Sequence, residues 1–348
     1  MCELFVVSSR MVSPESYDFL ATREPVLFDV WNNGMMSPRC LDDVVPCCHV
    51  AQGGNDKTGT TPNGAGVQSY ATAIAATCDR NAPCIKAARF SFGKKVIKIR
   101  WKKAPCYGCG GNFTRYPNGI FIPWENFRFE CIHTVDEIVA AMAAQIRPET
   151  RLFRWMEVGD FTPKTIRVAV ALALMFPDIR FYGYTKKYRL WNLYVEKHGG
   201  SIAAALPKNL VIRFSEWEGF PMDNRYGFPV SAFLPFGNDE PELVGDSVVC
   251  PCSEPEWVGC CGKCQACAHV RATVYLKEHS TAATKNGDAK VHAIRAMLKA
   301  RLSLGIWKSE KMVKKAQEKL DVAVSRVKKL GLSPDDYSPR FDTFQWDD

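Results

Sequence analysis

The chain has 348 residues, of which 47% are hydrophobic and 24% charged, the ordinary composition of a globular protein with ample core. No run of about 18 apolar residues occurs, which excludes a membrane span, and residues 1–10 lack the pattern of a secretory signal. The net charge of +8 is concentrated between Lys285 and Leu330, where 13 Lys and Arg face 4 Asp and Glu. The 15 cysteines, without an export signal, indicate a reducing compartment, where cysteines bind metal more often than they pair.

Residues 1–135 are predicted to form a mixed region of strands and loops with scattered cysteines. An apolar piece at Val26–Val30 indicates a short strand, and the Ala-rich segment Gln68–Thr77 favours a short helix. Apolar and basic residues alternate along Lys94–Lys103, which is typical of a half-buried strand with a basic outer face. Such a face is used either at a sheet edge to discourage pairing or as a phosphate-facing ribbon.

The middle of the chain alternates strands and helices. Thr162 and Pro163 are typical of an N-cap and a first helical position, and Gly199-Gly200 ends the second helix. This rhythm implies right-handed crossovers and a parallel sheet, resembling part of a TIM barrel. The predicted elements, in order, are a strand at Arg151–Val158, a helix at Lys164–Met175, a strand at Ile179–Tyr184, a helix at Lys187–His198 and a strand at Asn209–Phe214.

Ligands of such sheets bind beyond the carboxyl ends of the strands. Those ends supply Glu157 and Asp160 at the end of the first strand, Lys186 after the second and Ser215 after the third. These four are the candidate catalytic residues, with Glu157 or Asp160 as proton carrier and Lys186 as a clamp for an anion. Helix caps and surface charges occupy the same places, so a structural role is the alternative.

Residues Gly219–Val248 are rich in Pro, Gly and Phe, which predicts irregular structure. The stretch Cys250–Cys267 then carries six cysteines, ending in a C-x2-C-x2-C run. Two such loops in succession wrap three sulfurs around a small inorganic centre, as in bacterial ferredoxins. The predicted ligands are Cys250, Cys261, Cys264 and Cys267, although Cys252 is an alternative to Cys250 as the fourth.

The preferred cofactor is a [4Fe-4S] cluster, and the alternatives are a zinc ion held by four sulfurs or disulfide bonds. Other cysteines upstream, among them a C-x2-C pair at Cys106 and Cys109, leave a second site open without placing it.

Residues 285–335 carry two apolar stripes at helical spacing with basic faces, which predicts a hairpin of basic helices. The basic face is either simply solvated or a surface that binds nucleic acid through its phosphates. Residues 336–348 are acidic and aromatic and are predicted to form a tail. Residues 136–284 therefore comprise the predicted sheet core and the cysteine-rich segment.

Several segments together resemble the phage "gene product 88" family, known from actinobacteriophages. They are F-R-W-M-E-V-G-D-F at Phe153–Phe161, F-Y-G-Y-T-K at Phe181–Lys186, N-L-V-I-R-F-S-E-W-E-G at Asn209–Gly219, and the C-P…C-x2-C-x2-C block. The resemblance covers about Cys78 to His279, leaves out the basic helices, and implies a viral protein that works in the host cytoplasm. It supplies no established activity.

The sequence thus predicts an α/β protein with a partial parallel, TIM-barrel-like sheet, a cysteine-rich metal-binding segment and C-terminal basic helices. The predicted function is that of an iron–sulfur protein that acts on or near nucleic acid. One alternative is an enzyme resembling the radical S-adenosylmethionine class, whose C-x3-C-x2-C loop is not reproduced here. The other is a zinc-stabilised module that binds nucleic acid.

Overall fold

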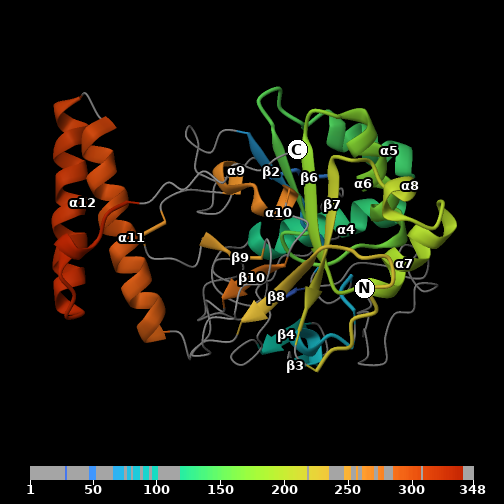
Figure 1. Ribbon diagram of the computed structural model, residues 1–348, viewed down its shortest axis with the longest axis horizontal. Coiled ribbons are helices and arrows are strands. Elements are labelled where there is room, and N and C mark those ends of the chain that lie inside the picture. Colours follow the sequence, from blue (N-terminus) through green and yellow to red (C-terminus); the bar gives the residue numbers. More distant parts are fainter. Residues whose placement is uncertain are drawn as a thin grey trace.

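A computed structural model gives the architecture of the protein (Figure 1). The residues that the structure describes are 28–29, 47–51, 66–73, 77–79, 81–86, 89–93, 96–100, 118–217, 219–234, 247–251, 256–257, 261–269, 273–277, 285–306 and 309–339.

The main element is a curled, seven-stranded parallel sheet that forms a half-barrel. Each hydrogen-bonded pair of neighbouring strands runs parallel, so the carboxyl ends of the strands share one rim. The strands, in spatial order, are β2 (Val67–Ser69), β5 (Leu152–Trp155), β6 (Arg180–Thr185), β7 (Leu210–Glu216), β8 (Val230–Leu234), β10 (Val274–Lys277) and β9 (Val248–Val249).

Helices cover the convex face of this sheet, and their bounds follow local signals. Thr162 and Thr165 form a capping box at the start of α6, with Pro163 in its first turn. Phe153, Phe181 and Phe214 point into the large core beneath these helices. The helices before and between the strands are α2 (Pro83–Lys86), α4 (Asn118–Ile132), α5 (Val135–Ala143), α6 (Pro163–Met175), α7 (Tyr188–Lys197) and α8 (Ile202–Ala205).

The opposite, concave face carries the alternate residues of the same strands. Val67, Leu152 and Tyr182 form a smaller apolar cluster there with Ala268. Ala268 lies in α10 (Ala266–His269), which packs on β6 and β7 and follows directly on α9 (Cys261–Cys264). In Figure 1, α9 and α10 lie across the sheet from α5, α6 and α7. The described end of the cysteine-rich segment, α9 and α10, therefore lies on the inside of the half-barrel.

Two further units complete the described chain. A small sheet joins β1 (Phe28–Asp29), β4 (Val96–Arg100) and β3 (Arg89–Gly93), with β4 central. Near the end of the chain, α11 (Lys285–Ile306) and α12 (Glu310–Lys329) pack side by side around their own apolar cluster, followed by the short 3-10 helix η6 (Pro334–Asp336). Within the described ranges no helix is long and apolar enough to cross a membrane.

Two local predictions are wrong. The segment expected to be a helix at Gln68–Thr77 begins as strand β2, because pairing with β5 overrides the helical preference of its alanines. The stretch expected to be irregular contains β8, a strand of five residues between β7 and β10. Short strands enclosed by Pro and Gly carry too few residues for a periodic signal.

Candidate functional site

The loop after β5, residues 156–160, is hydrogen-bonded to residues 70–72, which follow β2. Met156 and Gly159 both have positive φ, of 53° and 81°. Glu157 N donates to the Tyr70 carbonyl at 2.9 Å, and Thr72 N donates to the Val158 carbonyl at 3.1 Å. A Cβ on Gly159 would lie 2.4 Å from the Thr72 carbonyl oxygen, so only glycine fits at this position. Strained backbone of this kind is concentrated at functional sites.

Asp160 is buried at the end of this loop and accepts three hydrogen bonds. The donors are Thr185 Oγ1 at 2.6 Å, Phe161 N at 2.8 Å and Lys186 N at 2.9 Å. Burial raises the pKa of the Asp160 carboxyl above its ordinary value, although Lys187 and these hydrogen bonds oppose the shift. Thr185 lies four positions after Phe181 in β6, so the two side chains lie on the same face of the sheet. That face is the one covered by the helices. Asp160 therefore ties the ends of β5 and β6 together on the outer side of the rim.

Lys186 and Ser215 meet where β6 and β7 end. The Lys186 ammonium donates to Ser215 Oγ at 2.9 Å and lies 5.1 Å from the centre of the Trp217 ring. Trp217 in turn stacks on Phe233 from β8, with ring centres 4.1 Å apart. Ser215 follows Phe214 in β7, so the two side chains lie on opposite faces of the sheet. Because Phe214 lies in the core under the helices, Ser215 faces the inside of the half-barrel. The Lys186 side chain is thus held at the mouth of the half-barrel.

Glu157 occupies the same rim at β5. Ser69 Oγ donates to its carboxylate at 2.8 Å, and both residues are buried. The structure therefore brings Lys186 and Ser215 together and joins Asp160 to Lys186 through the backbone, whereas Glu157 bonds to a different strand, β2. All four candidate catalytic residues lie at the carboxyl rim.

The concave face below the rim carries two buried arginines that the sequence analysis missed. The side chain of Arg213 is fully buried and donates to the carbonyls of Cys267 at 3.0 Å and Val230 at 2.8 Å. Arg154 lies 5.8 Å from the ring centre of Tyr184, with which it shares this face. The available signal was an arginine inside an otherwise apolar parallel strand, in L-F-R-W and L-V-I-R-F.

The cysteine run contacts this same face. Tyr184 Oη donates to Cys267 Sγ at 2.7 Å, and Cys261 packs on the same apolar cluster as Cys267. Burial raises the pKa of Cys267, while Arg213 and the Tyr184 hydroxyl lower it. Cys264 is buried, and Cys250 N donates to the Tyr275 carbonyl at 2.8 Å beside the end of β9.

The four predicted metal ligands are not shown as a set. Across the described parts of the chain, no group of three or more His, Cys, Asp or Glu side chains is placed to hold a metal ion. Cys252 and Cys260 lie outside the described residues, as do Cys106 and Cys109 of the upstream pair. The donor chemistry is that of a thiolate site, but the described sulfurs do not by themselves form a coordination shell.

Comparison with models of protein families shows to which family the chain belongs. The family model "Gene product 88" matches residues 49–275, which is more than half of the sequence. The chain belongs to the Gene product 88 family. The Gene product 88 match takes in the rim, both buried arginines and the cysteine run, and it ends before α11 and α12. No curated protein and no solved structure matches the chain.

Proposed function

We propose that this Gene product 88 protein is an enzyme that binds an anionic group of its substrate, a phosphate or a carboxylate, at the rim of the half-barrel. The observation that carries the proposal is the Lys186–Ser215 pair, which joins the carboxyl ends of two neighbouring parallel strands. Ligands bind beyond these ends in open and barrel-like parallel sheets. A lysine ammonium and a serine hydroxyl at 2.9 Å supply a cation and a donor to one anion.

The cation is fixed before any substrate arrives, which limits the entropy lost on binding. Asp160 accepts a hydrogen bond from the backbone N–H of Lys186, and the Lys186 ammonium makes a cation–π contact with the ring of Trp217. In this proposal Lys186 and Ser215 touch the substrate and Asp160 is a positioning residue, since its oxygens already accept three hydrogen bonds. Glu157, on the same rim, is the carboxylate available to carry a proton.

Inorganic phosphate is the simplest probe for the site. A ligand at ten times its Kd stabilises the folded state by about 1.4 kcal/mol, or about 2 °C in Tm for a chain of this size. We expect phosphate to raise Tm relative to chloride at equal ionic strength, and Lys186→Met to abolish the increase. The control is Lys197→Met, which removes an exposed lysine at the end of α7. Equal stabilisation of Lys186→Met and the native protein would refute the assignment.

The positioning role of Asp160 has its own test. In Asp160→Asn one oxygen remains to accept from Thr185 and Phe161, but an amide nitrogen faces the backbone N–H of Lys186. We expect a loss of stability of about 1–3 kcal/mol and a weaker phosphate effect on Tm. Ser215→Ala should weaken the phosphate effect without that loss of stability, because Ser215 is only half-buried. If Asp160→Asn binds phosphate as tightly as the native protein, Asp160 does not position Lys186.

A second candidate function is iron–sulfur binding through Cys250, Cys261, Cys264 and Cys267. The supporting observation is the setting of Cys267, whose sulfur accepts from Tyr184 and whose neighbour is the buried Arg213. Thiolate-bound clusters are anionic, and hydrogen bonds and cations near the sulfurs tune their potentials. Zinc is the alternative metal for the same sulfurs. A reaction resembling that of radical S-adenosylmethionine enzymes remains the runner-up, and the site of action in this proposal is the host cytoplasm.

Metal content decides between these candidates. Anaerobically purified protein should contain iron and sulfide and absorb broadly at about 400 nm if a cluster is present. Replacing Cys261, Cys264 and Cys267 by serine should remove both signals, whereas Cys47→Ser, outside the run, should leave them intact. Colourless protein with stoichiometric zinc would establish the zinc alternative, and protein without either metal would remove this candidate while leaving the rim proposal untouched.

A further inference from the structure

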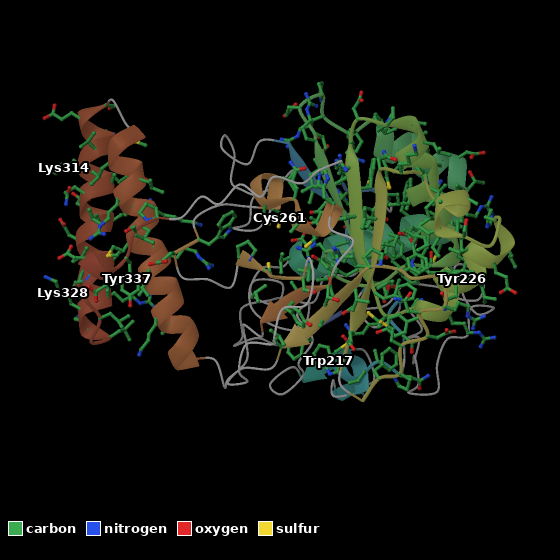
Figure 2. All side chains as sticks on the ribbon, viewed as in Figure 1. Trp217, Tyr226, Cys261, Lys314, Lys328 and Tyr337 are labelled. Atoms are coloured by element: carbon green, nitrogen blue, oxygen red, sulfur yellow. The ribbon has the colours of Figure 1, made fainter. Side chains whose placement is uncertain are left out.

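The helix α12 uses one side to pack on α11 and leaves the rest exposed. Ala323 and Val327 are buried against α11, with the partly buried Leu320 beside them, and Ala316 is also buried. These positions recur at helical spacing and form a single apolar stripe. The remaining positions are mostly exposed and mostly charged, and Figure 2 shows Lys314 and Lys328 on the side of α12 away from α11.

The exposed cations of α12 are not spread evenly around the helix but gather on one side of it. At 100° per residue, five cations fall within about a quarter-turn of one another and form what we call the cation stripe. Its members are Lys311, Lys315, Lys319, Arg326 and Lys329. The acidic residues of α12 lie outside it, Glu318 at its edge and Glu310 and Asp321 further round. From first to last the stripe extends about 27 Å along the helix.

The stripe is not neutralised by the parts of the chain that the structure describes. All five cations are exposed, and none of them forms an ion pair among the described residues. Like charges three or four positions apart destabilise a helix, so the spacing of Lys311, Lys315 and Lys319 carries a small cost. An anionic partner that runs along the helix would relieve that repulsion.

The chemistry of the stripe selects among anionic partners. A membrane-surface helix buries an apolar face in lipid, but the apolar face of α12 is already packed on α11. Only Val322, which is 71% exposed, adds apolar surface within the stripe. Single strands are held by stacking on aromatic side chains, and α12 contains no aromatic residue. A rigid row of phosphates, as in a duplex, matches a straight row of cations.

We propose that the cation stripe of α12 binds the phosphate backbone of double-stranded nucleic acid without reading its sequence. This function is separate from the rim site, because it rests on a helix outside the Gene product 88 match. Lysine and arginine act here as phosphate contacts, which set affinity and not base preference. The duplex is the partner, and an anionic membrane is an outcome that the test distinguishes.

The test measures binding of the full-length protein to a mixed-sequence duplex of about 20 bp by fluorescence anisotropy. Each neutralised phosphate contributes about −0.9 to the slope of log K against log salt, so five contacts give about −4.5. Between about 50 and 200 mM KCl the affinity should therefore fall about 500-fold. The variant Lys315→Gln, Lys319→Gln, Arg326→Gln should reduce this to about 12-fold, since two contacts remain.

The matched control removes the same charge outside the stripe. Lys290, Lys314 and Lys328 are exposed lysines, the first on α11 and the others on α12, and their triple replacement by glutamine also changes the net charge by three. This control variant should change the slope of log K against log salt by less than about 0.9, the contribution of one phosphate contact. Equal effects of the two triples would overturn the proposal, as would absence of duplex binding at 50 mM KCl. Tighter, stripe-dependent binding to phosphatidylserine vesicles than to the duplex would overturn it as well.

Discussion

The buried carboxyl of Glu130 gives the stability of the protein a pH dependence of unusual sign. Glu130 lies on α4, on the helix-covered side of the sheet, and is 3% exposed. Its two oxygens accept from Tyr70 Oη at 2.8 Å and Thr165 Oγ1 at 2.9 Å. Burial raises the pKa of Glu130 from 4.5 to about 7, although those hydrogen bonds and the nearby Lys164 oppose the shift.

The magnitude follows from linkage between protonation and folding. Between pH 4.5 and about 7 the folded state holds a proton on Glu130 that the unfolded chain has released, so stability falls as pH rises. A shift from 4.5 to about 7 corresponds to about 3 kcal/mol, fully lost above about pH 7. The variant Glu130→Gln cannot ionise and should lack this component.

The assay is urea unfolding of the native protein and Glu130→Gln from pH 4.5 to pH 8. We expect the difference in unfolding free energy to shift by about 3 kcal/mol in favour of the variant as pH rises through this window. The exposed Glu196→Gln on α7 serves as control and should leave the pH profile of the native protein unchanged. A difference between the native protein and Glu130→Gln that stays constant across the window would refute the reasoning.

Two further predictions concern the backbone of the rim and the concave face. Gly159→Ala should cost about 3 kcal/mol or more in urea unfolding, because a Cβ would clash with the Thr72 carbonyl at positive φ, whereas Gly200→Ala, with positive φ but open space, should cost only about 1 kcal/mol. Arg213→Met should cost about 2–4 kcal/mol by leaving the carbonyls of Cys267 and Val230 without their donor. The control Arg225→Met loses an exposed ion pair with Asp223 and should leave the unfolding free energy nearly unchanged.

The core of the half-barrel was predictable because its signals are local. Short strand-forming runs alternate with helices, of which α6 carries a capping box, and β5, β6, β7, α6 and α7 lie within a few residues of their predicted bounds. The parallel arrangement followed from the rhythm of these elements and is confirmed by their pairing. The curl of the sheet and the place of β8 depend on contacts between distant segments, which no local pattern encodes.

The rim shows what strand ends can and cannot predict. A residue directly after a parallel strand is fixed to one edge of the sheet, so the sequence placed Glu157, Asp160, Lys186 and Ser215 correctly at the rim. Which face each side chain takes depends on the loop. Met156 and Gly159, both at positive φ, break the alternation after β5, and Asp160 consequently meets Thr185 on the helix side.

The cysteine run demonstrates the same limit for a metal site. Spacing of C-x2-C places two sulfurs one turn apart on a helix, as for Cys261 and Cys264 on α9. Gln265, at a φ of 49°, then ends that helix, and α10 begins in a new direction. Cys267 consequently faces Tyr184 on the sheet, and its direction is set by the half-barrel as much as by the run. If the proposed metal site is loaded, its shell would depend on how α10 packs on the concave face, and Tyr184→Phe should then change its metal content or spectrum. A site set by cysteine spacing alone would be unaffected by Tyr184→Phe.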